Sequence, residues 1–119
     1  MAGIVRTRTN LEVRDVPASM AFYGEALGLQ PHATMGEPPE FALLASAGGS
    51  LGLARATGPA VASIVTCYVE VADLDRALAQ CEAAGAVITS PPEEHPWRVR
   101  DFVFRDLDGH LIGVGEQLG

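Results

Sequence analysis

Cysteine is rare in this 119-residue sequence, which contains only Cys67 and Cys81, and long apolar runs are absent. Two cysteines are too few to build a disulfide framework. The longest apolar run, residues 60–71, is interrupted and much shorter than the roughly 20 residues that a transmembrane helix requires. Residues 1–10 have no apolar core of signal-peptide length. We therefore expect a cytoplasmic protein with reduced thiols and no membrane partner.

Basic residues are also few, because eight Lys and Arg stand against 15 Asp and Glu, which makes the net charge −7. This balance excludes a nucleic-acid partner, which needs protein faces rich in Lys and Arg, and it disfavours anionic membranes. An acidic surface is compatible with a cationic small molecule. It serves ordinary solubility equally well, and we adopt that simpler interpretation.

The length indicates one domain over residues 1–119, and its first half predicts a strand, a helix and two further strands. The expected ranges are 5–13 (strand), 16–27 (helix), 40–45 and 50–55 (strands). Alternation places Arg8, Asn10 and Glu12 on one face of the first strand. Asp15 is expected to cap the helix and Gly28 to end it. Residues 29–40, which are rich in Pro and Gly, predict a loop or an irregular strand.

The second half repeats this pattern after a linker at about residues 57–61. The expected ranges are 63–71 (strand), 74–84 (helix), 86–89 (short strand), 90–96 (loop), 100–105 and 111–114 (hairpin strands). An overlay of the halves pairs Val13 with Val71, Asp15 with Asp73, Gly28 with Gly85, Phe41 with Phe102, and Gly52 with Gly113. Two βαβββ modules, at about residues 4–56 and 62–117, explain the repeat. We predict an α+β fold whose modules form a curled mixed sheet around a cavity, with the helices on the outside.

Two segments, one near the start of the chain and one near its end, point to a known family. They are LEVRDVPASMAFYGEALGL at residues 11–29 and FVFRDLDGHLI at residues 102–112. Together they resemble the vicinal oxygen chelate superfamily of glyoxalases, extradiol dioxygenases and bleomycin-type antibiotic-binding proteins. Leu107 stands where the family usually has proline. The resemblance implies the two-module fold and a homodimer whose cavities are built from modules of both subunits.

The resemblance also implies a divalent metal held by His, Glu or Gln on the strands of both modules. The corresponding positions here are Arg8, Gly52, Thr66 and Gly113. Arginine offers no lone pair, glycine has no side chain, and a lone threonine hydroxyl is a weak donor. A shift of two residues offers Asn10 or Glu12, Ser50, Tyr68 or Glu70, and Leu111 or Gly115, which supplies at most a scattered pair of carboxylates. We therefore predict no metal and no cofactor.

A cavity without a metal is an ordinary small-molecule site. Its expected floor is formed by Arg8, Asn10, Glu12, Thr66, Tyr68 and Glu70, with free volume at Gly52 and Gly113. The glycines are equally compatible with strand bulges, and the glutamates with a solvated sheet edge. Trp97 is the expected stacking partner of a flat ligand, and its alternative role is a subunit contact. Glu12 or Glu70 would balance a positive charge on that ligand.

Other reactive side chains favour structural roles. We expect exposed, solvated imidazoles at His32 and His95 and a structural histidine in the last hairpin turn at His110. Phe22 and Tyr23 are expected in the core, and Cys67 is expected to be a buried thiol. The sequence contains no nucleophile elbow and no phosphate-binding loop.

These observations favour a metal-free protein that sequesters a planar or aromatic compound such as an antibiotic, without turnover. The alternative is a glyoxalase- or dioxygenase-like enzyme with an unusual site that uses Glu12, Glu70 or Glu116, or a metal-free lyase or isomerase with Glu12 or Glu70 as the base. A third hypothesis is a structural or regulatory module without a ligand.

Overall fold

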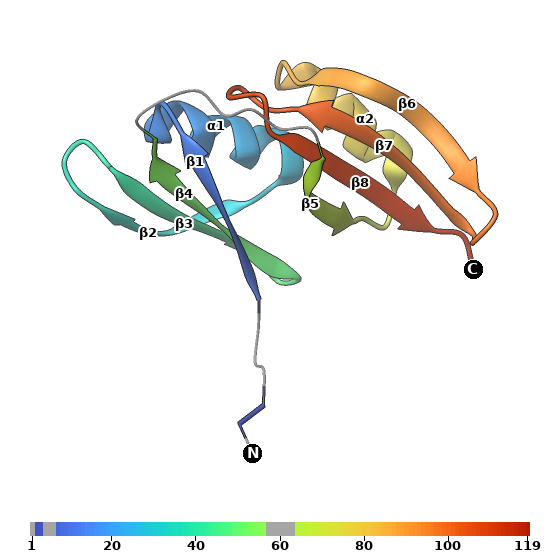
Figure 1. Cartoon of the computed structure of the whole chain (residues 1–119), viewed down its shortest axis with the longest axis horizontal. Helices are drawn as coiled ribbons and strands as arrows, with labels where there is room; N and C mark the ends of the chain where they lie inside the picture. The colour runs from blue at the N-terminus through green and yellow to red at the C-terminus, as the bar shows by residue number, and fades with distance from the viewer. Residues whose placement is uncertain (1, 4–6, 57–63) are drawn as a thin grey trace.

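The computed structural model describes residues 2–3, 7–56 and 64–119 and contains two mixed four-stranded sheets (Figure 1). The first module comprises β1 (Arg8–Val13), α1 (Val16–Leu27), β2 (Gln30–Met35), β3 (Phe41–Ser46) and β4 (Gly49–Arg55). The second comprises β5 (Val65–Glu70), α2 (Leu74–Ala83), β6 (Val87–His95), β7 (Val99–Arg105) and β8 (Leu111–Gln117). The sheets have the orders β1-β4-β3-β2 and β5-β8-β7-β6 and do not join into one. The predicted α+β fold of two βαβββ modules is confirmed, and the predicted linker lies outside the described residues.

The two modules repeat each other down to backbone geometry. Asp15 and Asp73 cap the two helices with the same φ of −136° and ψ of 98°. Each aspartate side chain accepts a hydrogen bond from the backbone N–H three residues later in the chain. The distances are 3.0 Å from Ala18 N to Asp15 and 3.1 Å from Arg76 N to Asp73. Gly28 and Gly85 follow the helices with φ of 70° and 91°, the left-handed region that glycine enters without strain. The predicted caps of α1, Asp15 and Gly28, are therefore confirmed, and Asp73 caps α2 in the same way as Asp15 caps α1, whereas at the other end of α2 Ala84 is the cap and Gly85 follows it.

One pair of the sequence overlay is wrong by a single residue. Phe102 lies opposite Val114 and is fully buried, whereas Phe41 lies opposite Ala54 and is half-buried. Because side chains alternate along a strand, a shift of one residue moves them to the other face of the sheet. The counterpart of Phe102 is Ala42, which lies opposite the buried Leu53.

Each sheet has one face packed on its helix and one face turned away from it, which we call the open face (Figure 1). In β1 the buried Leu11 and Val13 alternate with the exposed Arg8, Asn10 and Glu12, which therefore lie on the open face. The core between sheets and helices is apolar. Its largest fully buried side chains are Tyr23, Phe102, Phe104, Leu11, Leu44, Leu53, Leu74 and Ile112.

The edge strands depart most from expectation. Residues 90–96 were expected to form a loop, but β6 continues to His95, so that prediction is wrong. The register of β6 against β7 shifts between Ser90 and Glu93, where Pro91 and Pro92 lie. Proline cannot donate to a ladder, and an edge strand with a shift is where a sheet accepts it. On the other sheet, residues 30–35 form the strand β2 with every residue exposed.

The helices of the described residues are short. α1 has 12 residues and α2 has 10, and no helix in residues 7–56 or 64–119 has the length and apolar composition needed to cross a membrane.

Candidate functional site

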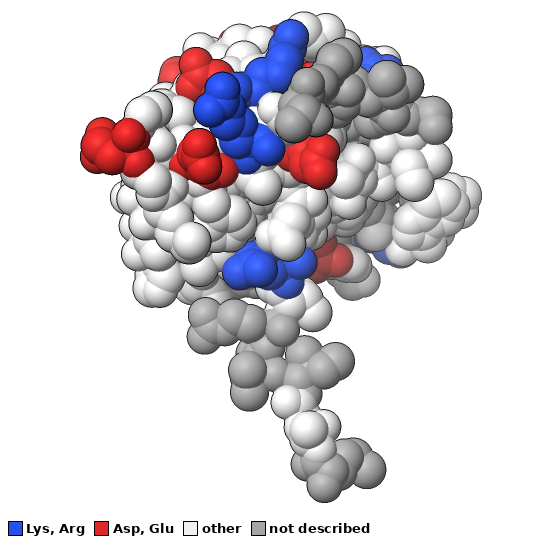
Figure 2. Space-filling view, turned by 60° about the vertical axis from the view of Figure 1, so that its left-hand side comes forward, with Lys and Arg blue, Asp and Glu red and all other residues white. Residues whose placement is uncertain are grey.

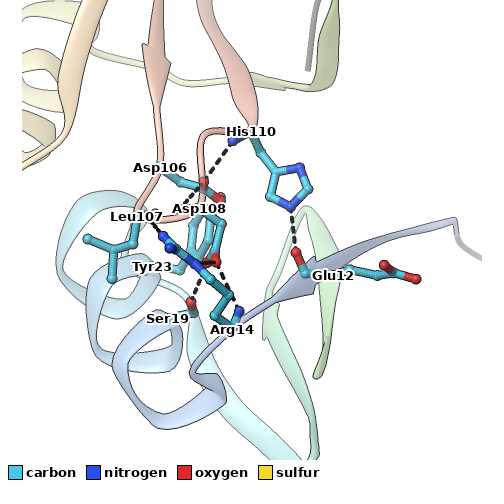
Figure 3. A network of polar contacts seen from close by, with 8 residues as sticks. All are labelled: Glu12, Arg14, Ser19, Tyr23, Asp106, Leu107, Asp108 and His110. Atoms are coloured by element: carbon cyan, nitrogen blue, oxygen red, sulfur yellow. Dashed lines mark hydrogen bonds and ion pairs between the residues drawn. The ribbon is translucent and has the colours of Figure 1, made fainter. Parts of the chain in front are cut away.

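The last hairpin ties the second module to the first through a cluster of polar contacts that we call the module clamp (Figure 3). Asp106 Oδ1 accepts hydrogen bonds from the backbone N–H groups of Asp108 and His110, both at 2.9 Å. Gly109 completes the turn with a φ of 94°. The hairpin residues 106–110 are thus held in one conformation, and Asp106 and Asp108 are buried.

Contacts of the module clamp reach β1, α1 and Arg14, which lies between them in the first module. The Tyr23 hydroxyl donates a short hydrogen bond to Asp106 Oδ2. Arg14 donates to Asp108 Oδ1 from both its backbone N and its side-chain Nε, each at 2.9 Å. His110 Nε2 lies 2.7 Å from the carbonyl oxygen of Glu12, so this nitrogen carries the proton. The expected structural role of His110 is confirmed.

A cavity of about 480 Å³ lies between the modules. Its wall comes from Thr7 and Thr9, the end of α1 with Tyr23, Leu27 and Leu29, the β3–β4 turn, residues 67–71 and Ile112. Most of this lining is apolar or carries hydroxyl groups. Glu70 is the one formally charged side chain among the described residues of the wall. A cavity of this size and composition suits a small organic molecule.

The predicted site residues divide between this cavity and the open faces of the sheets. Tyr68 and Glu70 border the cavity along β5, although the contacts of their side chains lie on the open face of the second sheet. Arg8, Asn10, Glu12 and Thr66 are exposed and lie outside its lining, as does Trp97. Sequence reasoning missed the wall formed by Thr7, Thr9, α1 and the β3–β4 turn. Those residues meet only when the modules pack together, and no local pattern announces that contact.

Neighbouring side chains occupy the space above Gly52 and Gly113, where the sequence predicted free volume. A Cβ atom on Gly113 would lie 2.6 Å from Cδ2 of the Tyr68 ring, and one on Gly115 would overlap the Tyr68 hydroxyl. In the first module, a Cβ atom on Gly52 would overlap Oδ1 of Asn10. The glycines therefore do not leave free volume as expected. They allow Asn10 and Tyr68 to lie flat on the sheet.

Tyr68 begins a line of side chains along the open face of the second sheet. Its hydroxyl donates to Asp101 Oδ2 at 3.0 Å, and His95 Nε2 lies 2.8 Å from Asp101 Oδ1. The rings of His95 and Trp97 are stacked, with centroids 4.5 Å apart and planes 2° apart. Partial burial, and then the hydrogen bond to Asp101, raise the pKa of Tyr68 to about 12. Tyr68 is therefore a neutral donor at physiological pH.

The structure corrects the expectations for His95 and Cys67, and it adds Asp101, which the sequence analysis did not single out. His95 is half-buried and paired with Asp101, so the expectation of a freely solvated imidazole is wrong. β6 reaches His95 and places it opposite Val99, beside β7. Cys67 is half-buried rather than buried, because it faces the cavity. Trp97 is 66% exposed at the β6–β7 turn.

The family's metal-ligand positions do not fit a divalent ion in this chain. Gly52 and Gly113 provide no donor atom, and Asn10 and Tyr68 fill the space above them. Arg8 extends over the Phe41 ring, with its guanidinium carbon 5.7 Å from the ring centroid. Glu116, considered as an alternative ligand, accepts a hydrogen bond from Leu74 N at 3.1 Å. It therefore faces α2, whereas its neighbour Gly115 lies opposite Glu70 on the open face.

Within residues 7–56 and 64–119, no three His, Cys, Asp or Glu side chains lie close enough together to hold a metal ion. The residues at the family's metal-ligand positions do not fit a divalent ion, because their side chains offer no imidazole or carboxylate donor.

Comparison with solved structures finds the same fold in several bacterial proteins. TioX from Micromonospora sp. ML1 is 26% identical over 95% of this chain and 98% of its own, with a TM-score of 0.80. A glyoxalase/bleomycin resistance protein/dioxygenase from Nocardioides is 28% identical over 99% of this chain and 86% of its own, with a TM-score of 0.71. The fosfomycin resistance protein FosX from Listeria monocytogenes, 15% identical over 98% of this chain and 93% of its own, shares the fold with a TM-score of 0.78.

No curated protein matches the sequence. The family model, in contrast, matches nearly the whole chain, over residues 5–114. With the two βαβββ modules and the family motifs in place, the chain belongs to the Glyoxalase/Bleomycin resistance protein/Dioxygenase superfamily.

Proposed function

We propose that the chain is a metal-free small-molecule-binding protein that sequesters a planar or aromatic compound such as an antibiotic. The observation that carries the proposal is the replacement of the family's metal-ligand positions. Two of them are glycines covered by Asn10 and Tyr68, next to a largely apolar cavity of about 480 Å³. Sequestration needs affinity without turnover, and a preformed cavity with rigid aromatic walls provides it.

Aromatic walls explain the preference for a flat ligand. Tyr68 and Tyr23 both line the cavity, and each hydroxyl is held by an aspartate, so that each ring has a fixed orientation. A flat ring can stack on the partly exposed ring of Tyr68 at a small entropic cost, whereas the buried Tyr23 supports the wall from the core. The description of FosX as a fosfomycin resistance protein, and the family's own name, make antibiotics the first compounds to test.

We further infer a homodimer in the cytoplasm. The open faces carry half-buried apolar side chains, including Phe41, Leu43 and Val103, which a second subunit would cover. In that arrangement Trp97, together with Arg8, Asn10, Glu12 and Thr66 on the open faces, would contact the ligand or the partner subunit. Both cysteines are free, as is usual in a reducing compartment. Light scattering during gel filtration measures the mass, and a monomer at all concentrations would contradict the dimer.

The binding proposal is tested by titrating protein purified without chelator with a panel of planar antibiotics, followed by Trp97 fluorescence and calorimetry. We expect saturable binding of at least one planar compound that is recovered unchanged. Elemental analysis is expected to find far less than one divalent ion per chain, and EDTA is expected to leave affinity unaltered. Stoichiometric metal, or turnover of the bound compound, would favour the enzyme alternative.

A further inference from the structure

We propose that His95 and Asp101 are positioning residues for Trp97, the only tryptophan of the chain, and hold its indole in one orientation as a rigid surface for a flat ring. This inference deepens the binding function proposed above, because it assigns a role to two residues outside the cavity lining. It is tested without a ligand, so that its failure and the failure of the binding function are distinguishable.

The backbone of the β6–β7 turn, which carries Trp97, is held by hydrogen bonds at both of its ends. His95 is paired with Val99 in the ladder, and Arg98 N donates to the carbonyl oxygen of His95 at 3.1 Å. From the C-terminal end of the chain, Leu118 N donates to the carbonyl oxygen of Arg98 at 2.9 Å. These bonds hold Arg98 at a φ of 66°, a left-handed conformation that is uncommon outside glycine. The remaining freedom of Trp97 therefore lies in the torsions of its side chain.

The imidazole of His95 restricts those torsions. Its ring centroid lies 4.5 Å from that of Trp97, and the two planes are 2° apart, so one face of the indole rests on the imidazole. Trp97 is nevertheless 66% exposed, and its opposite face is therefore left to solvent. The side chains of His95 and Asp101 are only 22% and 21% exposed. The orientation of the exposed indole is thus set from below by a half-buried pair.

Asp101 fixes the plane of the imidazole on which the indole rests. His95 Nε2 donates to Asp101 Oδ1 at 2.8 Å, and the Tyr68 hydroxyl donates to Oδ2 at 3.0 Å, so both carboxylate oxygens are engaged. Because the carboxylate is held at both oxygens, it keeps one orientation and orients the imidazole with it. An aromatic ring that is already fixed loses less side-chain entropy when a flat ligand stacks on it.

No arginine replaces the imidazole as the support of the indole. Within the described part of the chain, the one cation–π contact joins Arg8 to Phe41 on the other sheet. Arg98, which follows Trp97 in the sequence, directs Nη2 to the carbonyl oxygen of Leu118 at 3.2 Å instead. Figure 2, which brings the first module forward, shows acidic and basic side chains interspersed, so the net charge of −7 forms no single acidic patch on that side. Stacking on the imidazole is therefore the contact that orients the indole.

The experiment follows Trp97 by time-resolved fluorescence anisotropy and by near-UV circular dichroism. In the wild type the indole is expected to tumble with the whole molecule and to lose little anisotropy within the first nanosecond. His95→Ala and Asp101→Ala are each expected to increase the sub-nanosecond loss about twofold, because a free exposed side chain moves on that timescale, and to weaken the indole dichroism. Asp101→Asn keeps an acceptor for His95 and is expected to stay close to the wild type.

His32→Ala is the matched control, because His32 is exposed on β2 of the other sheet, and it is expected to leave both signals unchanged. Far-UV circular dichroism verifies that each variant is folded. Tyr68→Phe is a milder second variant, because it removes only the donor to Asp101 Oδ2, and it is expected to move both signals in the same direction as Asp101→Ala.

A wild-type indole that already moves within a nanosecond would overturn the proposal. So would an indole that stays rigid in His95→Ala and Asp101→Ala, as one held by a partner subunit would. A rigid indole in Asp101→Ala alone would overturn the role of Asp101. Absence of binding to every compound in the antibiotic panel would overturn the binding function and leave these measurements unaltered.

Discussion

Both tyrosines of the chain line the cavity and donate their hydroxyls to aspartates, Tyr23 to Asp106 and Tyr68 to Asp101. Burial is the main cause that raises the pKa of each phenol, and the neighbouring carboxylates raise it further. A carboxylate that accepts from a neutral phenol fixes the orientation of the ring and keeps it uncharged. At the scale of single residues, both tyrosine rings next to the cavity are thus fixed in orientation and uncharged.

The phenol of Tyr68 is expected to ionise near pH 12, about two pH units above an ordinary tyrosine. Because its folded pKa exceeds its unfolded pKa, the stabilising contribution is full below pH 10 and is lost as the pH rises to about 12. Absorbance at 295 nm follows the ionisation. Asp101→Asn removes the charge and is expected to lower the Tyr68 pKa, which burial keeps above 10.

Asp75→Asn is a matched control for this titration, because Asp75 is an exposed surface carboxylate paired with Arg100. It is expected to leave the Tyr68 titration unchanged. Ionisation of Tyr68 near pH 10 in the wild type would contradict its hydrogen bond to Asp101.

At the scale of secondary-structure elements, local signals predicted the helices better than the strands. α1 occupies the predicted residues 16–27, because a capping aspartate and a terminal glycine mark its two ends. β6 was mistaken for a loop after residue 89, because its prolines are tolerated only by virtue of a register shift against β7. Such a shift is a property of two paired strands, and it is not visible in the sequence of one.

Gly113 of β8 is predicted to be required because the Tyr68 ring lies directly above it. Gly113→Ala would place its Cβ 2.6 Å from the Tyr68 ring, so the ring must leave the sheet and lose its bond to Asp101. We expect the free energy of unfolding to fall by about 1–2 kcal/mol in urea denaturation. Gly48→Ala, where a Cβ meets nothing within 4 Å, is expected to change it by less than about 0.5 kcal/mol.

A double-mutant cycle identifies the cause of that loss. In a Tyr68→Ala background the ring is gone, and Gly113→Ala is expected to cost much less than in the wild type. An equal cost in both backgrounds would show that the ring of Tyr68 is not what Gly113 accommodates.

At the scale of the whole molecule, the sequence predicted two modules and a cavity but not the walls of the cavity. Alternation correctly placed Arg8, Asn10 and Glu12 on one face, yet the cavity is lined by the odd-numbered Thr7 and Thr9 instead. Which faces meet depends on how the modules pack against each other. The turn residues Asp106 and Asp108 were recognisable as turn formers, but their contacts with Tyr23 and Arg14 span more than 80 residues and follow no local pattern.

The module clamp therefore couples the fold of the whole chain to the cavity. Asp106→Ala removes the acceptor of the Tyr23 hydroxyl and of two backbone N–H groups in a buried site. Unsatisfied buried donors cost about 1–3 kcal/mol each before relaxation, so we expect a loss of about 2–4 kcal/mol in urea denaturation. Asp75→Ala, which breaks a surface ion pair, is the control, with an expected loss below about 1 kcal/mol.

Ligand binding should follow the same coupling, because Tyr23 is at once a member of the clamp and a wall of the cavity. Under native conditions where Asp106→Ala remains folded, the affinity for a planar compound that binds the wild type is expected to fall, since the Tyr23 ring loses the contact that orients it. A variant as stable as the wild type, with unchanged affinity, would mean that the contacts of Asp106 contribute nothing measurable to the joining of the modules. A loss of stability without a loss of affinity would confine the clamp to folding and leave Tyr68 as the wall that orients the ligand.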